Sequence, residues 1–140
     1  MVDARTPAEP GVVVVTGASR GIGAAVALRA AAQGYAVAVS FLTDEAAAQG
    51  VVRHIASSGG RARAIQGDVA CEDDVLRLFQ TADRELGPLK ALVNNAGVTG
   101  GFARVEAVTL DVVTRVLAVN VIGTVLCSRV ELCSGFTDHR

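Results

Sequence analysis

Hydrophobic residues in this chain form short continuous runs, which alternate with longer segments in which apolar residues recur every three to four positions. Four of the runs are rich in Val, Ala and Leu, as in strands that a sheet buries on both faces. The predicted strands are Gly11–Thr16, Ala36–Phe41, Ala62–Gln66 and Lys90–Asn94. Continuous apolar runs of this kind favour a parallel sheet.

The segments between these strands have helical periodicity and helix boundary signals. The predicted helices run from about Ile22 to the stop signal at Gly34, from Thr43 to Gly59-Gly60, and from about Glu72 to Leu86. Thr43 is the expected N-cap of the second helix. Asp44 and Glu45 would then occupy its first turn, where the helix dipole favours acids.

A longer helix is predicted from Thr109 to Leu132. The expected inner face carries Leu110, Val113, Leu117, Val121 and Val125, with Asn120 beside them. Val112, Val116 and Val119 are assigned to an outer face, which is apolar enough to pair with a second helix. This face makes a homo-oligomer one possible state of the protein.

Strands and helices alternate four times, which predicts an α/β fold. The expected architecture is a Rossmann-like doubly wound parallel sheet that ends after the fourth strand and its following helix. One domain accounts for the length of 140 residues. We assign it to residues 11–133, with a flexible tail at residues 1–10 and a polar tail at residues 134–140.

The composition of the chain argues against several classes of protein and of binding site. The chain is 51% hydrophobic and 19% charged, with a net charge of −1, which argues against disorder and against nucleic-acid binding. Three cysteines without a CxxC pair, and two distant histidines, indicate neither a disulfide framework nor a metal site. The first ten residues lack a signal-peptide pattern, and the apolar stretch Val116–Cys127 is too short to span a membrane. A cytoplasmic protein without membrane contact is expected.

Candidate chemistry begins where the first strand runs into Thr16-Gly17-Ala18-Ser19-Arg20-Gly21-Ile22-Gly23. The next helix would direct its N-terminal amides at this turn, which suits an anion. The spacing Gly-x3-Gly-x-Gly differs from GxGxxG and lacks the Lys-Ser/Thr ending of a Walker loop, which disfavours a nucleotide triphosphatase. Taken alone, the motif is equally compatible with a structural tight turn.

Three further motifs follow in register: Asp68-Val69 after the third strand, Asn94-Asn95-Ala96-Gly97 after the fourth, and Asn120 in the last helix. Together with the glycine turn, they resemble the short-chain dehydrogenase/reductase family over Val12–Arg129. The resemblance implies an NAD(P)-dependent oxidoreductase acting on an alcohol or carbonyl. It assigns the pyrophosphate to Gly17, Gly21, Ile22 and Gly23, the adenine to Asp68 and Val69, the adenosine ribose to Asn94, Asn95, Ala96 and Gly97, and a catalytic role to Asn120.

Each of these residues also has a structural interpretation. Asp68 could accept backbone amides within its loop, and Asn94-Asn95 could simply end a strand. Asn120 could be an amide satisfied by a neighbouring carbonyl, and Arg20 a solvated turn residue.

The cofactor preference follows from the end of the second strand, Val39–Thr43, which contains no acid that would bind a ribose 2′-hydroxyl and repel a 2′-phosphate. Arg20 resembles the basic residue that NADP-preferring members place against the 2′-phosphate, with Ser19 and Ser40 as hydroxyl donors. NADP(H) is therefore expected over NAD(H).

The family's proton donor is a Tyr followed four positions later by a Lys, with a Ser beside them, and this chain contains no Tyr-x-x-x-Lys. Its single tyrosine is Tyr35 and its single lysine is Lys90. We expect the 140 residues alone to be inactive and Ala91–Asn94 to form an exposed sheet edge. Three hypotheses remain open: the N-terminal portion of a reductase, a non-catalytic dinucleotide-binding module completed by a separate C-terminal half, and a dimerising interaction protein.

Overall fold

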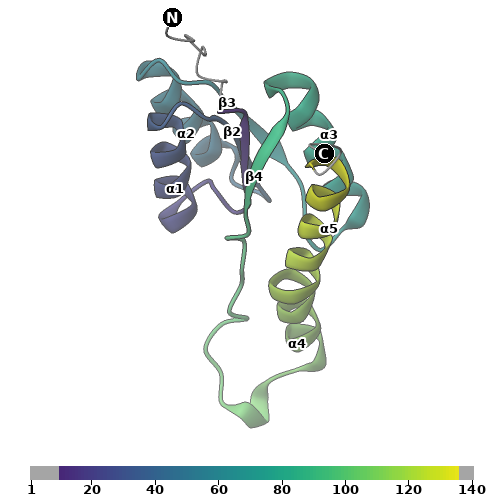
Figure 1. The fold of residues 1–140 in the computed structure, drawn as a ribbon. Coiled ribbons are helices and arrows are strands. Elements are labelled where there is room, and N and C mark those ends of the chain that lie inside the picture. Colours follow the sequence, from purple (N-terminus) through teal and green to yellow (C-terminus); the bar gives the residue numbers. More distant parts are fainter. Residues whose placement is uncertain (1–9, 136–140) are drawn as a thin grey trace, which may run out of the picture.

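The computed structural model describes residues 10–135, so the predicted tails lie mostly outside the described residues. Within that range four strands form one parallel sheet in the order β3-β2-β1-β4 (Figure 1). The strands are β1 (Val12–Val15), β2 (Ala36–Phe41), β3 (Ala62–Gln66) and β4 (Leu89–Val93). The predicted α/β class and doubly wound arrangement are confirmed.

The two central strands carry the core. Every residue of β1 and β2 is buried, and Val13 is paired with Val37 on one side and with Ala91 of β4 on the other. Strands β3 and β4 lie at the edges of the described sheet and are partly exposed. Burial on both faces explains why the central strands read as unbroken apolar runs.

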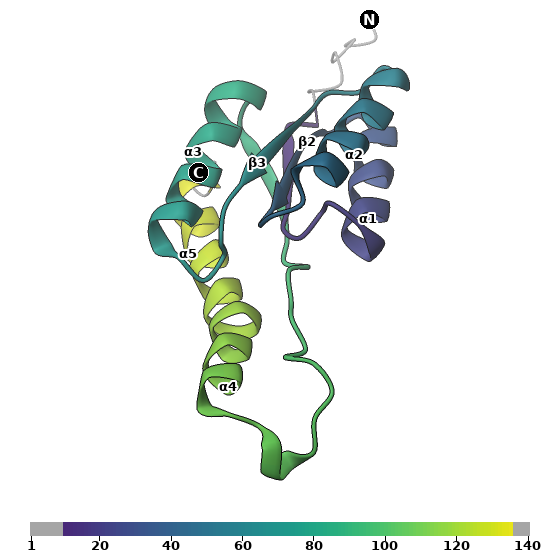
Figure 2. The ribbon, with the colours of Figure 1, turned by 180° about the vertical axis from the view of Figure 1, so that it is seen from behind.

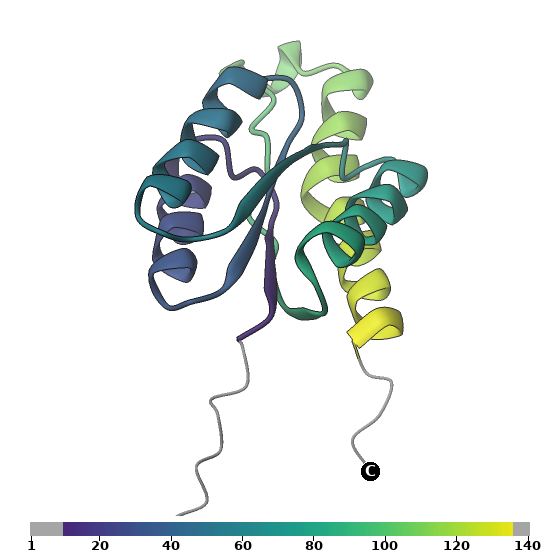
Figure 3. The same ribbon diagram turned by 90° about the horizontal axis from the view of Figure 1, so that it is seen from above.

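Helices cover both faces of the sheet (Figures 2 and 3). Side chains of α1 (Gly21–Ala32) and α2 (Glu45–Ser57) share one core cluster with Val13, Val15, Val37 and Val39. Side chains of α3 (Glu72–Leu86) and α5 (Thr124–Gly135) share the other with Val12, Val14 and Ala38. Successive residues of each strand therefore face opposite sides of the sheet. Because a helix follows each of the parallel strands in the chain, the amino ends of the helices lie at the carboxyl ends of the strands.

The cap of α2 differs from the prediction. Asp44, not Thr43, is the N-cap, and its carboxylate accepts a hydrogen bond from the Ala47 amide at 3.0 Å. The helix begins one residue later than expected. A carboxylate beside the positive helix end is a stronger acceptor there than a hydroxyl, which accounts for the shift.

The last helix starts after Thr109, as predicted, but it is not uniform. Its segments are α4 (Leu110–Leu117), the π-helical segment η2 (Ala118–Gly123) and α5, preceded by the 3-10 turn η1 (Val105–Ala107). The Thr109 hydroxyl accepts a hydrogen bond from the Val112 amide at 3.4 Å. The π-helical segment adds a residue to one turn and so rotates α5 relative to α4.

The predicted inner and outer faces of this helix are reversed. Leu110, Val113, Leu117, Val121 and Val125 are exposed, whereas the residues turned towards the protein include Val112, Val116, Val119, Cys127 and Val130. Both stripes are apolar, so periodicity alone could not choose between them. Close packing decides which stripe faces inward. The helix turns Gly123 towards the loop after β3, where a Cβ on this residue would lie 2.7 Å from the Val69 Cγ2 atom.

The sequence predicts no segment long enough to span a membrane. Judged by length and composition alone, one helix of the structure differs from this prediction. Leu110–Cys133 forms 24 continuous helical residues that are apolar enough to cross a membrane. The same helix nevertheless packs Val119, Cys127 and Val130 into the core of the domain, and Arg129 forms an ion pair with Glu72 of α3. These contacts are those of a helix that covers a sheet.

Candidate functional site

A cleft of about 230 Å³ opens at the carboxyl ends of the strands. It is bounded by the turn after β1, the end of β2, the loops after β3 and β4, and one side of α4. Of the residues predicted from the sequence, it brings together Gly17, Ser19, Arg20, Ser40, Asp68, Val69, Asn95, Ala96 and Gly97. Gly21, Ile22, Gly23, Asn94 and Asn120 are not among its lining residues.

The glycines of the turn have separate tasks. Gly17 has φ +61°, and a Cβ there would lie 2.9 Å from the Cα of Ala96. A Cβ on Gly23 would lie 2.3 Å from the carbonyl oxygen of Gly17, so this position must remain bare for helix and turn to meet. Gly21 has φ +57° and open space on its Cβ side. Two glycines thus permit close packing, and the third bends the chain beside open space.

Hydrogen bonds hold this turn against the loop after β4. The Thr16 hydroxyl accepts the amides of Asn95, at 3.1 Å, and Ala96, at 3.0 Å. The side-chain amide of Asn95 donates to the carbonyl oxygens of Thr16 and Gly17. On the other side, the Ala18 amide donates to the Ser40 carbonyl at 2.9 Å. The turn is therefore fixed to both neighbouring strands.

The amino end of α1 has the features of an anion site. Within residues 10–135, its N-cap Arg20 makes no side-chain cap bond, and the first turn contains no acid. The first amides of a helix lack partners in their own helix, and the dipole adds positive potential. Arg20 is exposed beside them and lines the cleft. The residues present therefore fit a phosphate group.

Asp68 lies deeper in the cleft, after β3. Its Oδ1 accepts the Ala70 amide at 2.9 Å, and its Oδ2 accepts the Arg115 Nη1 at 2.8 Å. Partial burial raises the pKa of this carboxyl, but the hydrogen bonds from Arg115 and Ala70 and the charge of Arg115 together lower it below its usual range. Asp68 is therefore held as a carboxylate on the wall of the cleft.

Sequence reasoning missed other lining residues. Arg115 and Val119 lie one turn apart on the helix, and both contribute to the wall. Asp44 lines the cleft from the start of α2 while its carboxylate caps that helix. A spacing of four residues places Arg115 and Val119 on the same side of a helix. Because the periodicity of the sequence assigned that side to the outer face, these residues were not predicted to line the cleft.

Asn120 and Asn94 make internal hydrogen bonds. The Asn120 Oδ1 accepts the Val98 amide and its Nδ2 donates to the Val98 carbonyl, both at 2.8 Å. The Asn94 Nδ2 donates to the Ser128 hydroxyl at 3.1 Å. Asn120 therefore holds the chain after β4 against the π-helical segment, in agreement with the structural interpretation of this amide.

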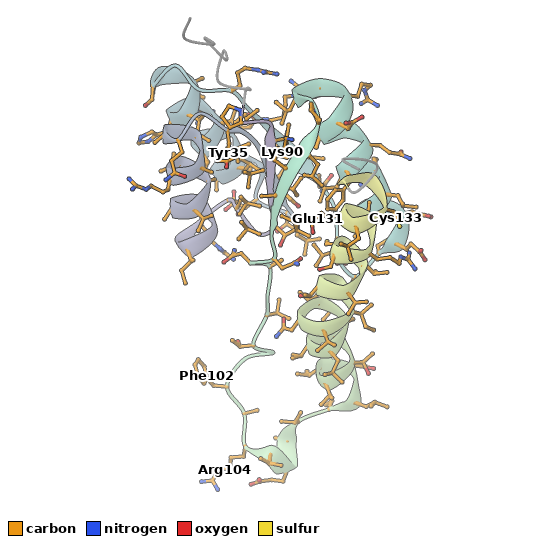
Figure 4. The ribbon with its side chains drawn as sticks, in the orientation of Figure 1. Tyr35, Lys90, Phe102, Arg104, Glu131 and Cys133 are labelled. Carbon is orange, nitrogen blue, oxygen red and sulfur yellow. The ribbon has the colours of Figure 1, made fainter. Side chains whose placement is uncertain are left out.

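Tyr35 and Lys90 lie away from the cleft, near the amino ends of β2 and β4 (Figure 4). Tyr35 lines a different cavity with Pro10 and Gly34. Neither the tyrosine nor the lysine of this chain can reach a group bound at the carboxyl ends of the strands.

Comparison with known proteins agrees with this geometry. The sequence profile of the short chain dehydrogenases matches residues 11–134. An uncharacterized oxidoreductase, YgfF, of Escherichia coli K12 is 44% identical over 118 residues, which are 84% of this chain and 48% of that protein. A 3-oxoacyl-[acyl-carrier-protein] reductase of Synechocystis sp. is 40% identical over 118 residues, which are 84% of this chain and 47% of that protein.

Among solved structures, a short chain dehydrogenase of Burkholderia cenocepacia J2315 in complex with NADP superposes with a TM-score of 0.86 at 37% identity. The match covers 91% of this chain and 51% of that one. The chain thus spans about half the length of the relatives it matches. The profile match, the sequence identity and the parallel sheet with its glycine turn together show that the chain belongs to the short-chain dehydrogenase/reductase family.

Proposed function

We propose that this chain binds NADP(H) in the cleft at the carboxyl ends of the strands, as the cofactor-binding portion of an oxidoreductase acting on an alcohol or carbonyl. The observation that carries the proposal is the amino end of α1, which no side chain caps, directly after Ser19 and the exposed Arg20, two residues that line the cleft. When bound, the nicotinamide ring would supply the hydride chemistry. The residues of this chain bind and orient the dinucleotide.

The pyrophosphate is assigned to the turn from Gly17 to Gly23. Gly21 leaves its Cβ side open for an approaching phosphate, and the amides of the first helical turn supply donors. Ile22 contributes its backbone there, because its side chain is 77% exposed. Packing of Gly17 and Gly23 against Ala96 and Asn95 keeps this turn rigid before any ligand arrives.

The adenosine is assigned to the other end of the cleft. Asp68 would accept a hydrogen bond from the adenine amino group, and the Val69 amide would face the ring. Asn94, Asn95, Ala96 and Gly97 would line the ribose. Asp68 suits this task because each carboxylate oxygen can accept more than the one bond it has here.

Preference for the 2′-phosphorylated cofactor is assigned to Arg20, with Ser19 and Ser40 beside it in the cleft. A guanidinium can hold a phosphate through two parallel hydrogen bonds. Asp44 lies at the same end and would oppose the added phosphate, but its carboxylate already caps α2. The complex of the Burkholderia relative with NADP supports binding of a nicotinamide dinucleotide in this fold.

Reduction of a carbonyl also needs a proton donor near the nicotinamide, and these 140 residues contain no Tyr-x-x-x-Lys. Asn120 is the family's catalytic position present here. We therefore propose that this chain supplies cofactor binding and that turnover requires groups from a further segment. A non-catalytic dinucleotide-binding module is the second candidate, favoured by the distance of Tyr35 and Lys90 from the cleft.

The three free cysteines, Cys71, Cys127 and Cys133, support a reducing, cytoplasmic compartment.

Binding measurements test the proposal. The 140-residue chain is titrated with NADPH and NADH by calorimetry, in wild type, Arg20→Gln and Arg29→Gln. Arg29 lies in the last turn of α1, outside the cleft, and serves as the matched control. Wild type should bind NADPH more tightly than NADH. Arg20→Gln should weaken NADPH binding about tenfold or more while changing NADH binding little.

Three results would each contradict a different part of the proposal. No saturable binding of either nucleotide by folded wild type would reject the dinucleotide site. Equal affinity for NADPH and NADH would reject the cofactor preference alone. A carbonyl-dependent oxidation of NADPH by the 140-residue chain would reject the requirement for a further segment.

A further inference from the structure

Arg115 joins α4 to the loop after β3 across a separation of 47 positions in the sequence. Its Nη1 donates to the Asp68 Oδ2 at 2.8 Å, and its side chain is 43% exposed. Arg115 and Asp68 both line the cleft. The ion pair therefore lies on the wall of the candidate binding site.

The loop itself is held by other contacts. The Asp68 amide donates to the Asp74 Oδ2 at 2.8 Å, and Arg77 of α3 donates to both Asp74 and the Gln66 carbonyl. The Ala70 amide closes a local turn on the Asp68 Oδ1. These bonds fix the backbone at Asp68 without Arg115. What Arg115 adds is a charged partner for the second carboxylate oxygen.

The position of Arg115 is set by close packing of the helix on this loop. Gly123 leaves room for Val69, and Val119, which is 4% exposed, lines the cleft one turn after Arg115. The helix thus carries Arg115 to Asp68 at the wall of the cleft. An arginine at this place has four further N–H donors besides the one bound to Asp68.

We infer that Arg115 is a positioning residue of the adenine end of the site: by holding one oxygen of Asp68, it orients the carboxylate for the exocyclic amino group of the base. This inference rests on the proposed dinucleotide binding and deepens it. It also predicts that the contribution of Arg115 depends on that amino group. A purely structural ion pair would affect all dinucleotides alike.

The charges around Asp68 determine the pH response. Those facing it or sharing its cleft are Arg115 of α4, Asp74 and Arg77 of α3, Arg20 before α1 and Asp44 before α2. Arg77 neutralises Asp74, so Arg115 is the cation bonded directly to the Asp68 carboxylate. Removal of Arg115 should raise the pKa of Asp68, and binding that depends on the carboxylate should then weaken at a higher pH.

The test measures affinity of the full 140-residue chain for NADP⁺ and for its hypoxanthine analogue, in which an oxygen replaces the adenine amino group. The variants are Arg115→Met, Arg115→Lys and Arg129→Met. Arg129 lies on the same long helix and pairs with Glu72 outside the cleft, so it is the control for loss of an ion pair. NADP⁺ is used because the reduced form decomposes at low pH.

Arg115→Met should lose about tenfold in affinity for NADP⁺ and less than about twofold for the analogue, with Arg115→Lys intermediate. As the pH is lowered, NADP⁺ binding by Arg115→Met should also begin to weaken at a higher pH than NADP⁺ binding by wild type. Arg129→Met should match wild type with both ligands. Unchanged NADP⁺ affinity in Arg115→Met, or an equal loss with both ligands, would overturn the inference. Failure of wild type to bind NADP⁺ would reject the proposed function, and this inference with it.

Discussion

Two regions of the described structure, residues 11–97 and residues 98–133, differ in how many large hydrophobic side chains they leave exposed to solvent. The first region exposes three large hydrophobic side chains, Ile22, Leu42 and Leu76. The second, though much shorter, exposes ten, from Phe102 to Leu132. Phe102 extends from the loop after β4 (Figure 4). The first region also contains the dense hydrogen bonding around Thr16 and Asn95.

This contrast separates two parts of the fold. The glycine turn and its supports form most of the cleft from contacts made within residues 11–97. The long helix contributes Arg115 and Val119 to that cleft, yet it turns a second apolar stripe outward. Substitutions in the glycine turn and on the two faces of the helix should therefore differ in their effects, and four predictions test this contrast.

The largest effect is expected from Gly23→Ala. Its Cβ would lie 2.3 Å from the Gly17 carbonyl oxygen and 2.5 Å from the Asn95 Nδ2, both held by the turn. Backbone cannot shift there without breaking the cradle, so we expect a loss of about 3 kcal/mol in unfolding free energy and loss of dinucleotide binding. Thermal or urea unfolding with calorimetry measures both. Gly50→Ala, within α2, where a Cβ would meet only the Arg53 Nη2 atom at 3.8 Å, should instead stabilise by about 0.5–1 kcal/mol. Similar effects of the two substitutions would contradict the packing described for the turn.

Thr16→Val should have the next largest effect. The substitution keeps the shape of a 2% exposed side chain but leaves the Asn95 and Ala96 amides without their acceptor. We expect a cost of about 2–3 kcal/mol, measured by urea unfolding. Thr81→Val, whose side chain makes no hydrogen bond within residues 10–135, is the matched control and should change stability by less than about 0.5 kcal/mol. An equally small effect at Thr16 would mean that the loop after β4 is not held by this hydroxyl.

The helix faces can be tested with one substitution at two positions. Val119→Ala removes methyl groups from a side chain that is 4% exposed, and Val121→Ala does so from one that is 52% exposed. The first should cost about 1–2 kcal/mol in unfolding free energy, and the second less than about 0.5 kcal/mol. Urea unfolding distinguishes them. The reverse ranking would restore the face assignment predicted from the sequence.

The smallest effect concerns Cys127 and is confined to alkaline pH. Burial raises the pKa of this thiol from 9.0 to about 11. Because the folded pKa is the higher one, its contribution to stability is complete below about pH 9 and is lost as pH rises towards 11. The melting temperature of wild type should therefore fall more between pH 9 and 11 than that of Cys127→Ala. Parallel curves would contradict this. At pH 8, iodoacetamide should modify the exposed Cys71 and Cys133 before Cys127.

Much of the fold could be predicted from the chain. The bounds of β2, β3 and α3 agree with those expected, because β-branched runs, acidic first turns and Gly-Pro terminators are local signals. The cap of α2 was misplaced by one residue, since both Thr43 and Asp44 are good N-caps. Local signals identify an element well and its exact boundary less well.

The candidate site was predictable where its chemistry lies in contiguous motifs. Gly17, Arg20, Asp68 and Asn95 were identified from the turn and the strand ends, and they share one cleft. Arg115 was missed, because its partner Asp68 lies 47 positions away and no local pattern connects them. The structural use of Asn120, which bonds to both polar groups of the Val98 backbone, was open to either interpretation.

The sequence by itself determined the alternation of strands and helices, the parallel sheet and the glycine turn, because hydrophobic periodicity and glycine conformation act over a few residues. Only the tertiary structure decided which apolar stripe of the last helix faces inward and which cation meets Asp68. Both depend on how closely Gly123 lets the helix approach Val69, and that distance is set by packing between segments far apart in the chain.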